Sequence, residues 1–148
     1  MVTALNVANN FLQRAFAENI DISPMKLQKL IYFMYREYLH ETGKSLFEEH
    51  FETWEYGPVL PTVYRHFKGY GSSGITRFAQ MENNRYTTIS ESNEKIADAI
   101  NYVWDKYKKK NGWELSELTH AKGSAWHKAF EAKRPYLLDT DIKLEETI

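Results

Sequence analysis

The chain contains no cysteine, and it has only four prolines and seven glycines among its 148 residues. Without cysteine the sequence cannot form disulfide bonds, a thiol nucleophile or cysteine-ligated zinc. It also lacks any apolar run near the roughly 18 to 20 residues that a membrane-spanning helix requires, so we expect no membrane partner. The net charge of −1 gives the chain no overall field that would attract nucleic acid.

The residues that are present are typical of a globular core. Hydrophobic residues make up 43% of the chain and charged residues 26%, whereas aromatic residues reach 15%. No repeat, low-complexity tract or linker divides the sequence, so we expect a single domain over residues 1–148. The first ten residues lack the basic region and apolar core of a signal peptide, which predicts a cytoplasmic protein.

Apolar residues recur at spacings of three and four along most of the chain, which predicts about six helices. Two of them have clear starts, at Thr3 and at Ser23-Pro24, where a hydroxyl can cap the helix. Asn19 and Gly43 are expected to end these two helices. The expected helices span residues 3–18, 24–42, 61–68, about 90–109, 113–120 and a short segment after Ser124.

Residues 51–61, with the sequence FETWEYGPVLP, interrupt the helical pattern. Their aromatic residues favour extended backbone, and Gly57-Pro58 is a turn signal. A further hairpin could pair residues 75–79 with residues 85–89 across Glu82-Asn83-Asn84. The sequence therefore predicts a mainly α, compact single-domain helical fold with a short strand or small β-hairpin.

The sequence offers no catalytic or metal-binding motif. Its five histidines (His40, His50, His66, His120 and His127) have no metal-ligand spacing on a shared helix face. No Gly-x-Ser-x-Gly elbow is present, and Glu145-Glu146 looks like a solvated pair of carboxylates. We therefore expect no metal, no cofactor and no enzymatic activity. A hydrolase would need His120 or His127 hydrogen-bonded to a carboxylate inside a cleft.

A basic cluster made of Lys106 and residues 108–110 allows two interpretations. Cations at the end of a helix complement its dipole, and clustered lysines can also bind phosphates. The first two helices could form a helix-turn-helix, but the start of the second is only modestly basic for a recognition helix. The residues favour the structural interpretation and do not favour nucleic acid as a partner.

Four large aromatic residues are open to two interpretations as well. Trp54, Tyr56, Trp113 and Trp126 can fill the core, or some of them can form a protein-binding patch on the surface.

Three stretches of the chain resemble one known family. Residues 26–32 read Lys-Leu-Gln-Lys-Leu-Ile-Tyr, residues 54–59 read Trp-Glu-Tyr-Gly-Pro-Val, and residues 115–120 with Ser124-Ala125-Trp126 supply Leu-x-x-Leu-Thr-His and Ser-x-Trp. As a set, in this order and spacing, they are similar to the Panacea domain family of SocA-like or GepA-like phage-associated proteins. The resemblance runs from about residue 4 to residue 130.

This resemblance implies a small, mostly helical bacterial or prophage domain that serves as an antitoxin. Its partner would be a cognate protein toxin, bound directly and without catalysis. The alternative is a proteolytic adaptor that delivers the toxin to a ClpXP-type protease, or a DNA-binding regulatory protein. The candidate partner-binding residues are Trp54, Tyr56, Pro58, Lys26, Lys29, His120 and Trp126. The motif residues either contact the toxin or hold the fold, and the sequence leaves both roles open.

Overall fold

The computed structural model describes residues 2–80 and 85–146, and these residues form a mainly helical fold with one small sheet. Within them lie seven α-helices, a short 3-10 helix and two strands. Their bounds are α1 Ala4–Glu18, α2 Pro24–Thr42, β1 Glu52–Trp54, β2 Gly57–Val59, α3 Pro61–Phe67, η1 Lys68–Tyr70, α4 Glu94–Tyr107, α5 Gly112–Thr119, α6 Ala125–Glu131 and α7 Asp139–Leu144. The predicted fold class is confirmed, with α7 as one helix more than expected. No helix within the described ranges has the length and apolar character needed to cross a membrane.

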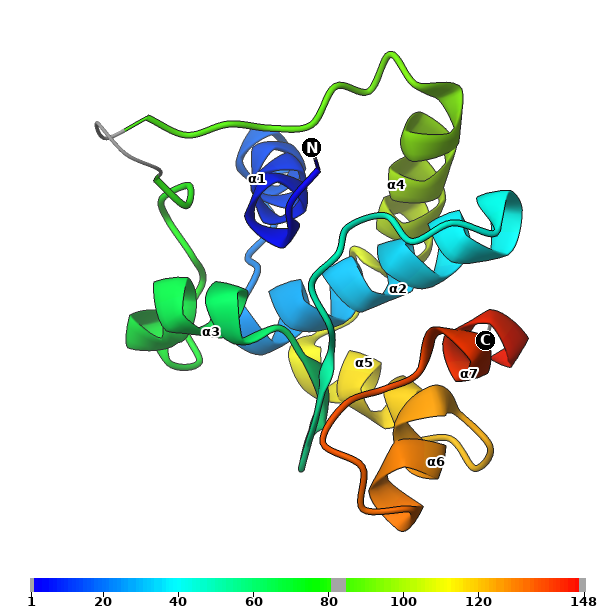
Figure 1. Ribbon diagram of the computed structural model, residues 1–148. Helices are drawn as coiled ribbons and strands as arrows, with labels where there is room; N and C mark the ends of the chain where they lie inside the picture. The colour runs from blue at the N-terminus through cyan, green and yellow to red at the C-terminus, as the bar shows by residue number, and fades with distance from the viewer. Residues whose placement is uncertain (1, 81–84, 147–148) are drawn as a thin grey trace.

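Helix α2 is the central element of the fold (Figure 1). It packs against α1, α3, α4, α5 and α7 and against strand β2. The helix begins as predicted, because the Ser23 side chain accepts a hydrogen bond from the Lys26 backbone and Pro24 takes the first turn. Gly43 ends it with a left-handed φ of 72°. Every residue from Lys26 to Arg36 is buried, which explains why the apolar pattern extends almost around the helix.

The start of α5 differs from the sequence prediction. The predicted helix 113–120 begins one residue earlier, at Gly112, because the Asn111 side chain caps α5 by accepting a hydrogen bond from the Glu114 backbone. Helix α4 begins after Asn93, later than the predicted start at about residue 90. A Cβ atom at Gly112 would lie 3.1 Å from the Lys26 backbone nitrogen, so glycine allows α5 to begin in contact with α2.

Strands β1 and β2 form an antiparallel hairpin in which Trp54 pairs with Gly57. The chain therefore reverses at Glu55-Tyr56, and the predicted turn residues Gly57 and Pro58 belong to the second strand. On its other side β1 binds the segment after α6, since the Thr53 amide donates to the Pro135 carbonyl at 2.9 Å. Residues 135–137 are thus bound to the edge of the hairpin.

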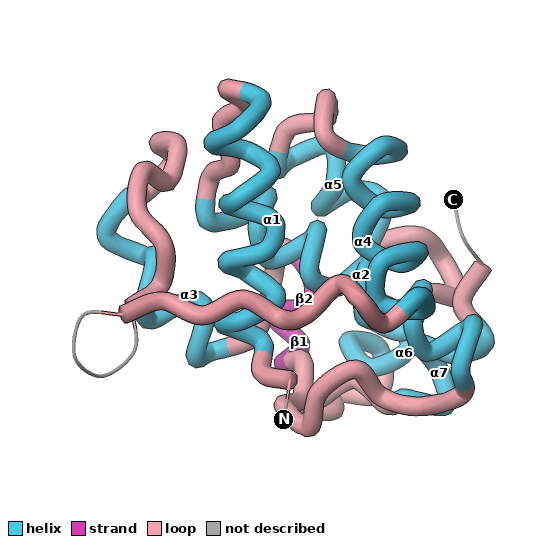
Figure 2. Tube along the Cα trace, turned by 90° about the horizontal axis from the view of Figure 1, so that it is seen from above, coloured by secondary structure: helices cyan, strands magenta, loops and turns pink. Residues whose placement is uncertain are grey.

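No strand forms at residues 75–79 or 85–89, so these two described segments do not make the second predicted hairpin. Its turn, Glu82-Asn83-Asn84, lies outside the described residues. Residues 85–93, which we call the strap, instead run across α1 towards the start of α4 (Figure 2).

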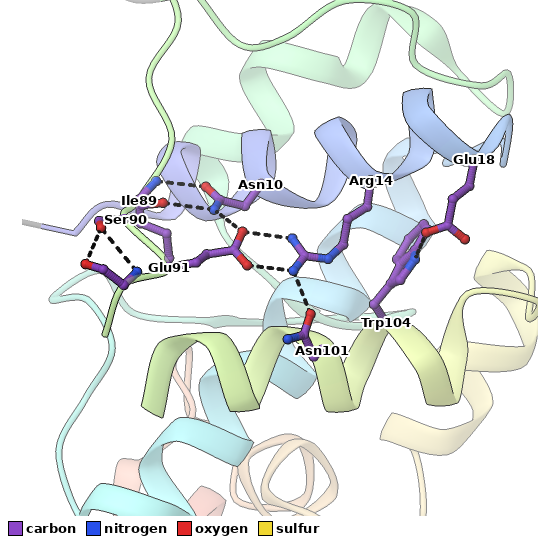
Figure 3. Close-up of polar contacts among 9 residues, drawn as sticks. Asn10, Arg14, Glu18, Ile89, Ser90, Glu91, Asn101 and Trp104 are labelled. Atoms are coloured by element: carbon purple, nitrogen blue, oxygen red, sulfur yellow. Dashed lines mark hydrogen bonds and ion pairs between the residues drawn. The ribbon is translucent and has the colours of Figure 1, made fainter. Parts of the chain in front are cut away.

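Two buried asparagines of α1 bind the segments on either side of residues 81–84. Each side-chain amide bonds both the N–H and the carbonyl of one residue, as a neighbouring strand would. The Asn9 side chain bonds both the N–H and the carbonyl of Ala79, at 2.8 and 3.0 Å. The Asn10 side chain does the same for Ile89, at 2.8 and 3.1 Å, and also donates to Glu91 (Figure 3). These amide contacts replace the ladder that a β-hairpin would have supplied.

An ion network fixes the strap at its C-terminal end (Figure 3). Arg14 contacts both carboxylate oxygens of Glu91, at 2.9 and 2.6 Å, and donates to Asn101 of α4 at 2.7 Å. The guanidinium holds the pKa of Glu91 below its usual range, because it bonds the charged form of the carboxylate. The strap is therefore anchored to α1 and to α4 together.

A buried ion pair joins α2 to the segment after α7. Arg36 Nη1 lies 2.6 Å from Glu145 Oε2, and both side chains are at most 5% exposed. The other Glu145 oxygen accepts from the Tyr32 hydroxyl and from the Ala125 amide, each at 2.9 Å. The prediction that Glu145 is solvated was wrong, because its cationic partner lies 109 residues away in sequence.

We predict that Asn10→Ala lowers the free energy of unfolding by about 1–3 kcal/mol, because it leaves two buried backbone groups of Ile89 without partners. Urea denaturation measures this loss, and hydrogen exchange should show faster exchange at the Ile89 amide than at the Leu30 amide of α2. Thr88→Ala, at an exposed position of the strap, is the matched control. Equal losses in the two variants would contradict the anchoring role of Asn10.

We predict that Glu145→Ala costs about 3–5 kcal/mol, because it leaves the Arg36 guanidinium buried without a counter-ion. Denaturant unfolding measures this cost. Glu146→Ala changes an exposed carboxylate next to it and should alter the stability by less than about 0.5 kcal/mol. A Glu145 variant as stable as the Glu146 variant would show that the pair is unimportant for stability.

Candidate functional site

The candidate site is built on the β1–β2 hairpin, whose backbone carbonyls are bound by side chains of the surrounding helices. Two of these side chains come from α2. The Gln28 amide bonds the N–H and the carbonyl of Leu60, at 2.9 and 3.1 Å. The next residue of α2, Lys29, donates through Nζ to the Pro58 carbonyl at 2.9 Å.

Three more polar side chains reach the tip of the hairpin, from α5, from the residue that ends α5 and from α6. Ser116 Oγ donates to the Tyr56 carbonyl at 2.6 Å, and Trp126 Nε1 donates to the Trp54 carbonyl at 2.7 Å. Between them, His120 Nε2 lies 2.9 Å from the Glu55 carbonyl. We call this set the carbonyl clamp; its members are Gln28, Lys29, Ser116, His120 and Trp126.

Gly57 allows the hairpin to lie this close to the helices. Its φ is 116°, a conformation that side chains rarely adopt. A Cβ atom there would lie 2.6 Å from Thr119 Oγ1 and 3.1 Å from Lys29 Cε. Glycine at this position is therefore required both by the backbone angle and by the contact with two helices.

Burial makes the charged form of Lys29 unfavourable. The residue is 1% exposed, and burial lowers the pKa of Lys29 from 10.5 to about 7. As an uncharged amine Lys29 still donates to the Pro58 carbonyl, so the hydrogen bond survives the loss of the charge.

Above the clamp, aromatic side chains remain on the surface. Tyr56 and Trp113 are 47% and 59% exposed, and their rings meet edge to face with centroids 5.2 Å apart. Trp54 and Tyr64, the latter 40% exposed, form a second such pair at 4.8 Å. A pocket of about 420 Å³ lies against Trp54, Tyr56 and Tyr64, and we call it the aromatic groove.

The predicted site residues fall into two groups. Trp54 and Tyr56 line the aromatic groove, with Trp54 half-buried and Tyr56 exposed. Pro58 is buried in β2, where its carbonyl is a partner of the clamp, and Lys29 is buried beneath it.

The other three predicted residues also have defined partners within the protein. His120 and Trp126 belong to the clamp, and their rings meet edge to face with centroids 4.1 Å apart. Lys26 is 5% exposed and its ammonium donates to the Lys108 carbonyl. With Lys26, Gln28 and Lys29 all buried, the start of α2 is not exposed as a DNA-recognition helix would be.

The two histidines named for a hydrolase have other contacts. The ring nitrogens of His120 face two backbone carbonyls, those of Ser116 and Glu55, at 2.6 and 2.9 Å. His127 lies 3.5 Å from Glu131, whose side chain is 70% exposed. Within the described ranges, no group of three or more His, Asp or Glu side chains could hold a metal ion.

Sequence reasoning did not identify three residues of this site. Tyr64 lies in the predicted helix 61–68, and its side chain is exposed at the aromatic groove. Gln28 and Ser116 lie inside the family-like stretches, yet nothing in their identity marks them as partners of the hairpin backbone. The available signal was a polar residue that has apolar neighbours one helical turn away in both directions, as Gln28 has Pro24, Met25, Ile31 and Tyr32 in α2.

Comparisons with known proteins agree on one family. The sequence model of the family described as "Antitoxin SocA-like, Panacea domain" matches residues 27–127. The chain is also 33% identical over 129 residues to the protein named "Antitoxin SocA" of Caulobacter vibrioides (strain NA1000 / CB15N), covering 84% of this chain and 69% of that protein. No solved structure matches the chain.

We predict that Lys29 makes the protein more stable as the pH rises from 7.5 to 9. Because the unfolded chain holds this proton up to about pH 10.5 and the folded chain releases it near pH 7, unfolding takes up a proton in this window. The free energy of unfolding should therefore rise by about 1.4 kcal/mol per pH unit relative to Lys29→Met. Urea denaturation at both pH values measures the difference.

The matched control for this prediction is Lys44→Met, at an exposed lysine, which should follow the pH dependence of the unchanged protein. A wild-type stability that exceeds that of Lys29→Met by the same amount at both pH values would show that Lys29 keeps its proton in the folded state.

Proposed function

The chain belongs to the SocA-like antitoxin family with the Panacea domain, and on this premise we propose that it neutralises a cognate protein toxin by direct binding. The proposed contact surface is the aromatic groove together with Trp113. In this proposal the protein is a non-enzymatic binding module, and its action on the toxin is occlusion.

The observation that carries the proposal is the exposure of Tyr56, Tyr64 and Trp113 next to one pocket. Tyrosine and tryptophan are enriched at the energetic centres of protein interfaces, because they bury a large area at a low entropic cost. Several large aromatic side chains gathered at one place are more than the single exposed apolar residues that are normal on a protein surface.

The carbonyl clamp supports this role, because it fixes the hairpin that carries Trp54 and Tyr56. A surface that is ordered before binding loses less conformational entropy when a partner binds. Lys29, Pro58, His120 and Trp126 would then serve the toxin-binding surface from beneath it and not by direct contact.

We predict that the double variant Tyr56→Ala/Trp113→Ala loses neutralisation of the toxin encoded by the neighbouring gene. Two anchors of about 2 kcal/mol each correspond to an increase in Kd of at least about 30-fold for either one. Growth rescue on co-expression and binding of the purified proteins both measure the effect. The substituted side chains are exposed, so circular dichroism should show an unchanged fold.

Tyr86→Ala/Tyr102→Ala is the matched control, because these tyrosines are 49% and 42% exposed and do not line the groove. It should rescue growth as well as the unchanged protein does. Equal loss in both double variants would refute the assignment of the surface. Failure of the unchanged protein to rescue growth with any neighbouring gene would refute the antitoxin function itself.

A further inference from the structure

A second and larger pocket adjoins the aromatic groove. It has a volume of about 880 Å³ and lies between the start of α2, the segment 71–74 and the turn that joins α4 to α5. Met25 and Gly71 line both pockets, and Trp113 lies at the edge of this one. Since Trp113 packs on Tyr56 of the groove, the two pockets form one continuous surface.

This second pocket is lined by cations, and we call it the basic pocket. Lys26, Lys108, Lys109 and Lys110 line it, against Asp21 as its one acidic residue. The chain as a whole has a net charge of −1, so the positive charge is a local property of this pocket. A locally basic surface on a nearly neutral protein selects acidic partners.

The charges of the pocket are only partly neutralised by the protein. Lys108 is paired with Glu18 at 3.0 Å. The side chains of Lys109 and Lys110 have no hydrogen-bond or ion-pair partner among the residues that the structure describes. Helix-dipole complementation, the structural interpretation of this cluster, accounts for cations at the end of α4 but not for their position on the wall of a pocket.

Lys26 adds a buried cation to the same wall. Its ammonium donates to the Lys108 carbonyl, which uses one of three N–H donors. Burial lowers the pKa of Lys26, while Glu114 and Asp21 act in the opposite direction. A carboxylate arriving in the pocket would stabilise the charged form further, because an opposite charge within about 4–6 Å favours ionisation.

We infer that the basic pocket binds an acidic segment of the toxin while the aromatic groove and Trp113 bind its apolar residues. This inference rests on the proposed function, because it assigns both pockets to one partner. The residues that line both pockets support a single partner. The positive charge of the basic pocket determines the chemistry of the toxin segment, which should contain Asp or Glu beside an apolar anchor.

The test is a charge reversal at the two unpaired lysines. Lys109→Glu/Lys110→Glu should weaken binding of the toxin about 10- to 100-fold at 50 mM salt, and the difference should shrink at 300 mM salt because charges are then screened. Lys109 and Lys110 are solvent-accessible residues just beyond the end of α4, so the variant is expected to fold.

Lys44→Glu/Lys143→Glu is the matched control. These exposed lysines also lie at or just beyond a helix end, and they line a different pocket beyond the other end of α2. A helix of 19 residues is about 28 Å long, so the control places the same charge change far from the basic pocket. The control pair should change the Kd less than about twofold.

A second measurement identifies the segment that is bound. Carbodiimide treatment of the complex joins lysine amines directly to nearby carboxylates, and mass spectrometry locates the joined residues. We expect links from Lys109 or Lys110 to Asp or Glu of the toxin, and none from Lys44 or Lys143. Links from the control lysines alone would overturn the inference.

The outcomes separate this inference from the proposed function. If the unchanged protein binds the toxin and Tyr56→Ala/Trp113→Ala abolishes binding, but the reversal at Lys109 and Lys110 has no effect, the basic pocket is not part of the interface. If the reversals at Lys109/Lys110 and at Lys44/Lys143 weaken toxin binding equally, the effect comes from the net charge of the protein. That result would also overturn the inference. A gel shift with upstream DNA that the Lys109/Lys110 reversal abolishes, with toxin binding unchanged, would assign the pocket to nucleic acid instead.

Discussion

The structure depends on supplying hydrogen-bond donors to the backbone carbonyls of one small hairpin. A two-stranded hairpin is only marginally stable alone, and a buried carbonyl without a partner costs about 1–3 kcal/mol. Five backbone carbonyls in and just after the hairpin, from Trp54 to Leu60, lie within hydrogen-bond distance of side chains of the carbonyl clamp. Because these side chains come from α2, from α5 and its C-terminal end, and from α6, the hairpin is stable only when it is packed against these helices.

The family-like stretches supply both the carbonyl clamp and part of the exposed surface, since Trp54 and Tyr56 belong to one of these stretches and also line the aromatic groove. The clamp residues lie beneath the surface, and Lys29 and Trp126 are buried. Tyr64 and Trp113 lie on the surface above and are exposed. A clamp that bonds backbone atoms does not depend on which side chains the hairpin carries. The outer surface of such a domain can therefore change with its partner while the clamp is kept.

Much of the fold could be predicted from local signals, and the rest depends on pairs far apart in sequence. The caps at Thr3 and Ser23 and the left-handed Asn19 follow from residue chemistry alone, and all three are confirmed. The burial of Glu145 could not be foreseen, because it follows from Arg36 in a distant helix. Asn111 could end one helix or begin the next, and the contact between Gly112 and α2 favours the second.

At the site, the aromatic residues could be named from the sequence, but only the fold shows which of them belong to the clamp and which lie on the surface. That the chain is one domain stays a prediction.

Holding the hairpin in place through the buried Lys29 lowers the stability of the protein. Burying an ammonium with one carbonyl partner is unfavourable, and the lowered pKa of Lys29 records that penalty. An apolar side chain there would avoid the penalty but would leave the Pro58 carbonyl without a donor. A lysine is long enough to reach from the central helix to the second strand, and it holds Gly57 and Pro58 against α2. Tyr56, one residue before them, is then placed against Trp113 before any partner arrives. Stability is therefore lost at Lys29, and the aromatic surface is ordered in the free protein. Under the proposed function, this order reduces the entropy lost when the toxin binds.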